Sequence, residues 1–144
     1  MNNKKKVKII LGIIIVLVAV VVPLVLYSRY DNRTRKIGDE LGISREKITR
    51  AYIMNGNSGE ITEIEKNEID GIYNNLESIS IKAIKIPPYT GWGYRLTFEC
   101  EDEVSEVTWN GSERCNINGT DFSVEKTAGN KLLQEVRKVN PKIN

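Results

Sequence analysis

The chain has 144 residues, a net formal charge of +2 and no histidine. The lack of histidine excludes Ser-His and Cys-His nucleophile systems and imidazole zinc sites built from this chain alone. Two cysteines are too few for a zinc site of four thiolates, and neither a GxxxxGK(S/T) nor a GxGxxG motif is present. The common ATPase and dinucleotide-binding classes are therefore disfavoured, and no cofactor and no metal is expected.

An unbroken apolar run at residues 9–27 predicts a transmembrane helix. At ~1.5 Å per residue it would be ~28 Å long, close to the ~30 Å hydrocarbon thickness of a bilayer. A cleaved signal peptide has a shorter apolar region followed by small residues, a pattern that Tyr27-Ser28-Arg29-Tyr30 does not match. The run is interpreted as an uncleaved signal-anchor with the lipid bilayer as its partner. A cleaved signal and a buried core helix are the alternatives.

The residues before and after this apolar run predict how the chain is divided and how it is oriented in a membrane. Residues 1–8 form a short basic tail, residues 28–46 are interpreted as a stalk, and residues 47–144 as an α+β domain. Because the tail is too short to fold and long domains translocate largely regardless of charge, we expect a single-pass protein of the cell membrane. We expect its N-terminus inside the cell and its domain outside. The reverse orientation stays open, since Lys and Arg are balanced on the two flanks.

The part of the chain after the apolar run is acidic. Residues 37–144 contain 13 Lys and Arg against 18 Asp and Glu, a net charge of −5. The basic residues cluster only beside the apolar run, whereas a nucleic-acid-binding protein needs them together on one face of its domain. No nucleic-acid partner is expected.

The first half of the domain predicts a β-hairpin, a helix and a strand. Alternating residues at 48–54 and 60–64 flank a turn sequence rich in Asn and Gly. Apolar residues at spacings of three and four predict a helix over residues 66–78. Residues 80–86 return to a strand, which ends at Pro87 because proline cannot donate to a ladder.

The second half predicts a four-stranded meander and a closing helix. Strands are expected at 94–100 and 104–109, and two Asn-Gly pairs further on are typical of tight hairpin turns. A helix over residues 128–139 ends before Pro141. The order β-β-α-β-β-β-β-β-α is typical of an α+β fold, a mostly antiparallel sheet with helices packed on one face. The residues expected in the core are Leu96, Phe98, Val107, Trp109, Ile117, either Phe122 or Val124, and the apolar stripes of the two helices.

Proline, glycine and aromatic residues are interleaved in residues 87–94, the candidate binding segment. Tyr89, Trp92 and Tyr94 on a loop stiffened by prolines could stack on sugars or receive an extended peptide, because Tyr and Trp offer large areas with few rotatable bonds. The structural alternative is favoured: Trp92 and Tyr94 fold back over the sheet edge, and Tyr89 is the more exposed residue.

Carboxylates cluster around the turn expected after residue 100. Glu99, Glu101 and Asp102 are followed by Glu103 and Glu106. Two carboxylates ~5 to 9.5 Å apart could perform glycoside hydrolysis, and several could bind calcium. The run lacks the spaced pattern of a calcium loop, so it is interpreted as a solvated turn. No catalytic residue is expected, and a carboxylate-based hydrolase is the enzymatic alternative.

Cys100 and Cys115 could form a disulfide in an oxidising environment. In the simplest meander, however, the strand at 104–109 lies between theirs and separates them by ~10 Å, whereas a bridge needs Cα atoms within ~7 Å. Two free thiols are therefore expected.

Three segments carry a resemblance to a known kind of protein. The succession NGNSGEITEIEKNEIDGIYNNL, IKAIKIPPYTGWGYRLTF and a terminal KLLQEV helix resembles small membrane-anchored or lipid-anchored exported domains of unknown function in Gram-positive bacteria. The resemblance covers residues 47–138, implies a bacterial surface location and brings no catalytic residues with it. The predicted function is non-enzymatic binding of an envelope component or partner protein. An accessory subunit of a membrane complex, of division or secretion type, is the alternative.

Overall fold

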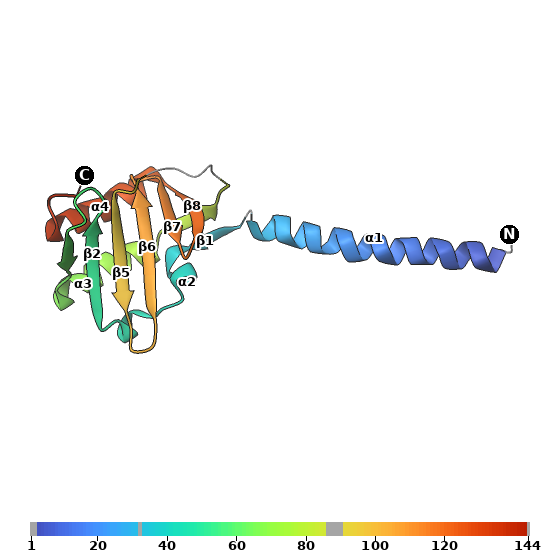
Figure 1. Ribbon diagram of the computed structural model, residues 1–144, viewed down its shortest axis with the longest axis horizontal. Helices are drawn as coiled ribbons and strands as arrows, with labels where there is room; N and C mark the ends of the chain where they lie inside the picture. Colours follow the sequence, from blue (N-terminus) through green and yellow to red (C-terminus); the bar gives the residue numbers. More distant parts are fainter. Residues whose placement is uncertain (1–2, 32, 86–90, 144) are drawn as a thin grey trace. The chain divides into compact units, whose positions relative to one another are not determined.

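The computed structural model describes residues 3–31, 33–85 and 91–143 and divides the chain into two units (Figure 1). The first unit, Met1–Arg33, contains one helix, α1 (Asn3–Asp31). The second unit, Thr34–Asn144, contains the sheet and the other helices. Every residue of the hydrophobic core that is described belongs to this second unit.

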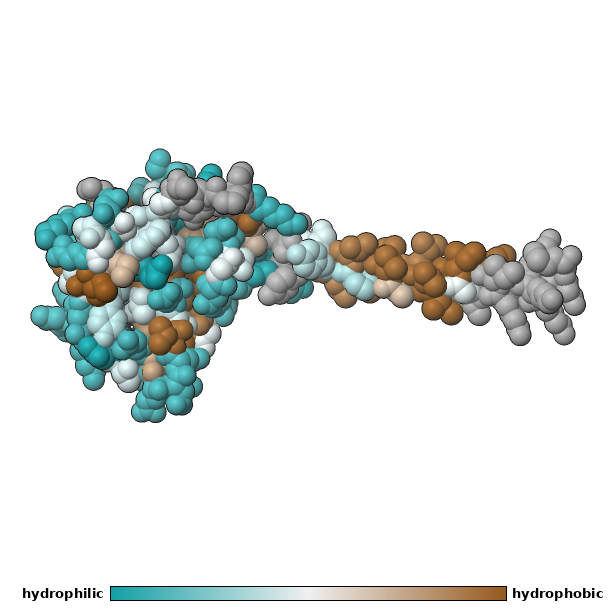
Figure 2. Space-filling view, in the orientation of Figure 1, coloured by the Kyte–Doolittle hydropathy of each residue, from teal (hydrophilic) through white to brown (hydrophobic). Residues whose placement is uncertain are grey.

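Helix α1 exposes apolar side chains at consecutive positions. Its described large apolar side chains from Ile10 to Leu26 are between 46% and 62% exposed, and Figure 2 shows the apolar part of the helix in brown. Consecutive exposed positions lie on all sides of a helix, so α1 has no single apolar stripe of the kind that packs on a core. Pro23 lies inside the helix.

The transmembrane prediction for residues 9–27 is wrong, because no helix in the described part of the chain combines the length and the apolarity needed to cross a membrane. The predictions that depended on this helix are corrected with it: the signal-anchor, the bilayer as partner, and the single-pass location with the domain outside the cell.

Eight strands form one sheet, and every neighbouring pair is antiparallel. The spatial order is β1-β4-β8-β7-β6-β5-β2-β3. Strands β5 to β8 form the meander, and the hairpin of β2 and β3 extends it at one edge. The bounds are β1 (Thr34–Lys36), β2 (Arg50–Asn55), β3 (Ile61–Glu63), β4 (Ser80–Ala83), β5 (Tyr94–Glu99), β6 (Val104–Asn110), β7 (Arg114–Ile117) and β8 (Thr120–Val124).

Helices cover one face of this sheet, as Figure 1 shows. They are α2 (Ile37–Leu41), α3 (Lys66–Glu77) and α4 (Lys126–Val139), and a 3-10 turn, η1 (Arg45–Lys47), precedes β2. Helix α3 contacts both α2 and α4, and α2 also contacts β6. Buried apolar side chains at i, i+3 and i+4 spacing explain why α3 packs here: Ile69, Ile72, Tyr73 and Leu76.

The order of elements from β2 to α4 is the expected one, but the fold-class prediction also placed a transmembrane helix before them and omitted β1, α2 and η1. Residues 34–46 belong to the globular unit rather than to a stalk. Ile37, Leu41 and Ile43 are buried in the core, which explains why this segment folds onto the domain. Their spacing was consistent with a continuing helix, but β1 pairs with the distant β4 and so draws the segment onto the sheet.

Strand alternation places one face of each strand in the core. The strand residues predicted for the core are all buried, including both Phe122 and Val124, whereas Leu133 and Val139 of the predicted α4 stripe are only partly buried. Phe98 and Leu132, expected on facing sides of the sheet–helix contact, are both fully buried. The strand parity and the helix face inferred from the pattern are therefore correct.

Hydrogen bonds hold the C-terminal segment against the β2–β3 hairpin. The side-chain amide of Asn55 donates to the carbonyl of Lys142 at 3.0 Å, and the side-chain amide of Asn140 donates to Oγ1 of Thr62 at 2.9 Å. Asn55 and Asn140 are almost fully buried, so these bonds satisfy amides that water cannot reach. They fix the path of the chain after α4.

Candidate functional site

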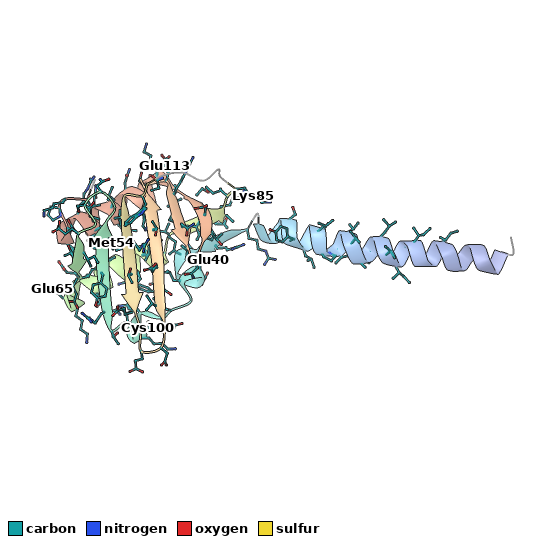
Figure 3. All side chains as sticks on the ribbon, viewed as in Figure 1. Glu40, Met54, Glu65, Lys85, Cys100 and Glu113 are labelled. Carbon is teal, nitrogen blue, oxygen red and sulfur yellow. The ribbon has the colours of Figure 1, made fainter. Side chains whose placement is uncertain are left out.

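The face of the sheet opposite the helices is uncovered, and we call it the open face. It carries the residues of each strand that alternate with the core positions. One row runs by direct cross-strand pairing from β3, at one edge of the sheet, to β8: Ile61, Met54, Arg95, Thr108, Asn116 and Asp121. A second row contains Glu63, Tyr52, Thr97 and Glu106. Figure 3 labels Met54 on this face.

Arg95 is held by three neighbours near the middle of the open face. Its guanidinium carbon lies 5.0 Å from the centre of the Trp92 ring, a cation–π distance. Its Nε donates to Oγ1 of Thr108 at 3.2 Å, and its Nη1 lies 3.5 Å from Oε2 of Glu106. Glu106 also accepts a hydrogen bond from the hydroxyl of Thr97. These contacts fix the guanidinium in one orientation while leaving part of it exposed.

A second cluster surrounds Tyr52 on the neighbouring strand. The guanidinium of Arg50 lies 5.2 Å from the Tyr52 ring centre, and Arg50 Nε donates to Glu63 at 3.1 Å. The Tyr52 hydroxyl donates to Oε2 of Glu99 at 3.4 Å. Desolvation raises the pKa of the Tyr52 hydroxyl above its usual value, so Tyr52 stays a neutral donor at physiological pH.

The open face also holds exposed apolar side chains. Ile61 and Val104 are each 59% exposed, and in the described part of the globular unit they are the large apolar side chains most exposed to solvent. Ile61 pairs directly with Met54, and Val104 pairs with Glu99. The outer surfaces of α2, α3 and α4 carry no comparable side chain among their described residues.

A shallow polar hollow of about 410 Å³ lies beside Arg95. Asn118 and Gly119, in the turn between β7 and β8, form part of its wall, and Asn118 has a positive φ of 49°. The other lining residues are Arg95, Val104, Glu106, Thr108 and Asn116. Amide, hydroxyl and guanidinium groups suit hydrogen bonding to a polar partner rather than enclosure of an apolar ligand.

The carboxylates suggested by the sequence do not converge on a common point. Glu99 and Glu106 project from the open face and are engaged by Tyr52, Thr97 and Arg95. Glu101 and Asp102 lie exposed in the β5–β6 turn. Across the described residues, no group of three or more Cys, Asp or Glu side chains could hold a metal ion.

The three aromatic residues of the candidate binding segment have different places. Tyr94 is 1% exposed and stacks on Trp109, with ring centres 6.0 Å apart and an interplanar angle of 9°, so it belongs to the core. Trp92 is half-buried two residues before the start of β5, where it contacts Arg95. Tyr89 lies outside the described residues. Of the two described residues, Trp92 is the one that contacts the open face, through Arg95.

Sequence reasoning missed four residues of the open face: Arg95, which contacts Trp92, and Tyr52, Met54 and Ile61 on the neighbouring strands. A signal for them was present, because they occupy the strand positions that alternate with the core. What the alternation does not reveal is which strands are neighbours. The pairing of β2 with β5 joins two segments that are far apart in the sequence.

Both cysteines are free. Cys115, on β7, is buried in the core, and this burial raises the pKa of its thiol to about 12. Cys100 follows β5 and is half-buried, which also raises its pKa. Strand β6 lies between β5 and β7, as the meander predicted.

Comparisons with protein-family models, with curated proteins and with solved structures find no match. The resemblance to exported Gram-positive domains therefore stays a prediction. The geometry of the open face carries the functional interpretation.

Proposed function

We propose that this protein is a non-enzymatic binding domain that recognises a partner protein through the open face of its sheet. The contact is centred on Trp92 and Arg95 and extends to Met54 and Ile61 along the row that crosses β2 and β3. The observation that carries the proposal is the distribution of exposed apolar side chains: within the described globular unit, the most exposed large ones, Ile61 and Val104, are both on this face.

The composition of the open face supports this choice. Aromatic residues, Met and Arg are enriched in protein interfaces, and Trp, Tyr and Arg dominate the residues that contribute most to binding energy. Here Trp92, Tyr52 and Arg95 are held by cation–π contacts and hydrogen bonds before any partner arrives. Binding would therefore cost little side-chain entropy, which favours affinity.

The arrangement of the carboxylates favours binding over hydrolysis. An acid–base pair has to flank one substrate bond, but Glu99 and Glu106 are already engaged by side chains of the open face. Glu101 and Asp102 project from a turn into solvent. The hollow beside Arg95 is polar and shallow, unlike the enclosed pockets of most small-molecule enzymes.

Site-specific photo-crosslinking tests the proposal. A benzophenone amino acid replaces Met54 or Val104, which are on the open face, or Lys131, which is exposed on α4 and serves as the matched control. Each variant is irradiated in cells that express the protein naturally. We expect a discrete adduct from Met54 and Val104, reduced by Ile61→Glu, and no such adduct from Lys131. Equal adducts from all three positions, or no adduct from the open face, would refute the proposal.

A further inference from the structure

Residues 140–143, which follow α4, lie against the β2–β3 hairpin, and we call them the C-terminal strap. Figure 1 shows the C-terminus beside the end of β2. Ile143 is 1% exposed and belongs to the hydrophobic core, and its carbonyl accepts a hydrogen bond from Nε of Arg137 at 2.8 Å. The strap is therefore anchored by a buried apolar side chain as well as by polar contacts.

The side chain of Asn55 joins the strap to the turn between β2 and β3. Its amide nitrogen donates to the carbonyl of Lys142 at 3.0 Å, while its oxygen accepts from the backbone amides of Asn57 at 2.9 Å and Ser58 at 3.3 Å. Asn55 is 3% exposed, so solvent does not replace a lost partner while the side chain stays in place. The orientation that serves the strap is therefore the one that serves the turn.

The same turn holds the segment that carries Trp92. The residue after Asn55 is Gly56, and its amide donates to the carbonyl of Gly93 at 2.8 Å. The Trp92 carbonyl lies against Gly56 so closely that a Cβ atom there would clash with it. On its other side, the Trp92 ring contacts the guanidinium of Arg95. An unbroken series of contacts thus runs from the strap to the centre of the open face.

The strap can leave the hairpin without opening the sheet. Its polar contacts with the hairpin are the bond from Asn55, the bond from Asn140 to the Thr62 hydroxyl, and the ion pair of Lys142 with Glu60. None of the three belongs to the ladder between β2 and β3. The ion pair is largely exposed and so contributes little. Segments held in this way open locally at a lower cost than global unfolding.

We infer that the C-terminal strap regulates the open face by positioning Trp92. While the strap is bound, the amide of Asn55 is fixed and the turn holds Trp92 on Arg95. Release of the strap loosens the turn and displaces Trp92, which weakens the contact with the partner. This inference rests on the proposed binding function and names how that site is controlled. By reciprocity, a partner bound at the open face stabilises the strap.

Fluorine NMR of the full-length protein labelled with 5-fluorotryptophan tests the inference. The chain has two tryptophans, and Trp92→Phe identifies the resonance of Trp92. Ile143→Asp releases the strap, because an unpaired carboxylate does not stay in the core. Asn55→Ala removes the bond between the strap and the turn. Ile81→Ala is the control for lost core packing: Ile81 is also 1% exposed but lies on β4, with three strands between it and β5.

We expect the Trp92 resonance to shift or broaden in Ile143→Asp and in Asn55→Ala, and to keep its position in Ile81→Ala. In the photo-crosslinking assay from Met54, Ile143→Asp should lower the yield of the adduct about tenfold, whereas Ile81→Ala should leave it unchanged. An unmoved Trp92 resonance in Ile143→Asp would overturn the inference, even if Asn55→Ala moves it, because the turn would then hold Trp92 without the strap. An equal change in Ile81→Ala would overturn it as well.

The two proposals fail in different ways. A Trp92 resonance that moves in Ile143→Asp, together with no adduct from Met54 in the otherwise unaltered protein, rejects the binding function and leaves the coupling of the strap to Trp92. A Met54 adduct whose yield is unaffected by Ile143→Asp, together with an unmoved Trp92 resonance, rejects the strap as a regulator and leaves the binding function standing.

Discussion

The backbone carbonyl of Trp92 occupies the space that a side chain on Gly56 would need. A Cβ atom built on Gly56 would lie 1.9 Å from the Trp92 carbonyl oxygen, and the Gly56 amide donates to the Gly93 carbonyl at 2.8 Å. The Gly93 amide in turn donates to the Trp109 carbonyl at 2.7 Å. The β2–β3 turn therefore positions the segment that brings Trp92 to Arg95.

Replacement of Gly56 by alanine should destabilise the protein by about 1–3 kcal/mol, because the new methyl group forces the turn and the Trp92 segment apart. Gly71→Ala is the matched control: nothing lies within 4 Å of a Cβ at this α3 position. It should stabilise the protein by about 1 kcal/mol through higher helix propensity. Urea unfolding measures the change in stability for both variants. Equal effects of the two substitutions would contradict the close approach.

Replacement of Asn55 by alanine should lower the free energy of unfolding by about 1–3 kcal/mol, since it leaves the Lys142 carbonyl and the turn amides of Asn57 and Ser58 without their partner. It should also speed proteolysis after residue 140. Asn74→Ala, at an exposed position of α3, is the control and should change stability by less than about 0.5 kcal/mol. Equal resistance of the C-terminus to proteolysis in both variants would argue against a stabilising role for the Asn55–Lys142 hydrogen bond.

Trp92 and Trp109 should respond differently to truncation. Trp109 is fully buried, so Trp109→Ala should cost about 3–5 kcal/mol. Trp92 is half-buried and contacts Arg95, so Trp92→Ala should cost only about 1–2 kcal/mol, of which the cation–π contact contributes about 0.5–1. Thermal and urea unfolding compare them. Equal losses would place Trp92 in the core and remove it from the interface.

The two thiols should be distinguishable by reagent and by pH. A thiol reagent at pH 8 should modify Cys100 in the folded protein and Cys115 only after denaturation, and Cys100→Ser should abolish the native reaction. In the unfolded chain the Cys115 thiol ionises near its ordinary pKa of ~8.5. In the folded protein burial raises the pKa of this thiol to about 12. Stability should therefore fall as pH rises from about 9 to about 12, and less steeply in Cys115→Ala. An identical slope in that variant would contradict the burial of the thiol.

Local sequence patterns determined the elements of the domain from β2 to α4. The alternation at Leu96 and Phe98 identified the core face of β5, and the Asn-Gly turns marked the hairpins of the meander. These features are determined by neighbours in the chain, through side-chain period and turn conformation, and so they can be inferred without knowledge of the fold. Segment 34–46 was misassigned because its structure depends on a distant strand. Apolar character alone also led to the wrong prediction for α1.

Only the tertiary structure decided which outward-facing residues act together. Met54 and Arg95 are directly paired although 38 residues separate their strands along the chain. The burial of Tyr94 and the partial exposure of Trp92, only two residues apart, follow from the stacking of Tyr94 on Trp109 and the docking of Gly93 against Gly56. Composition revealed the aromatic residues, but strand order decides which of them reach a shared face, because non-local pairing is specified by the packing of the whole domain.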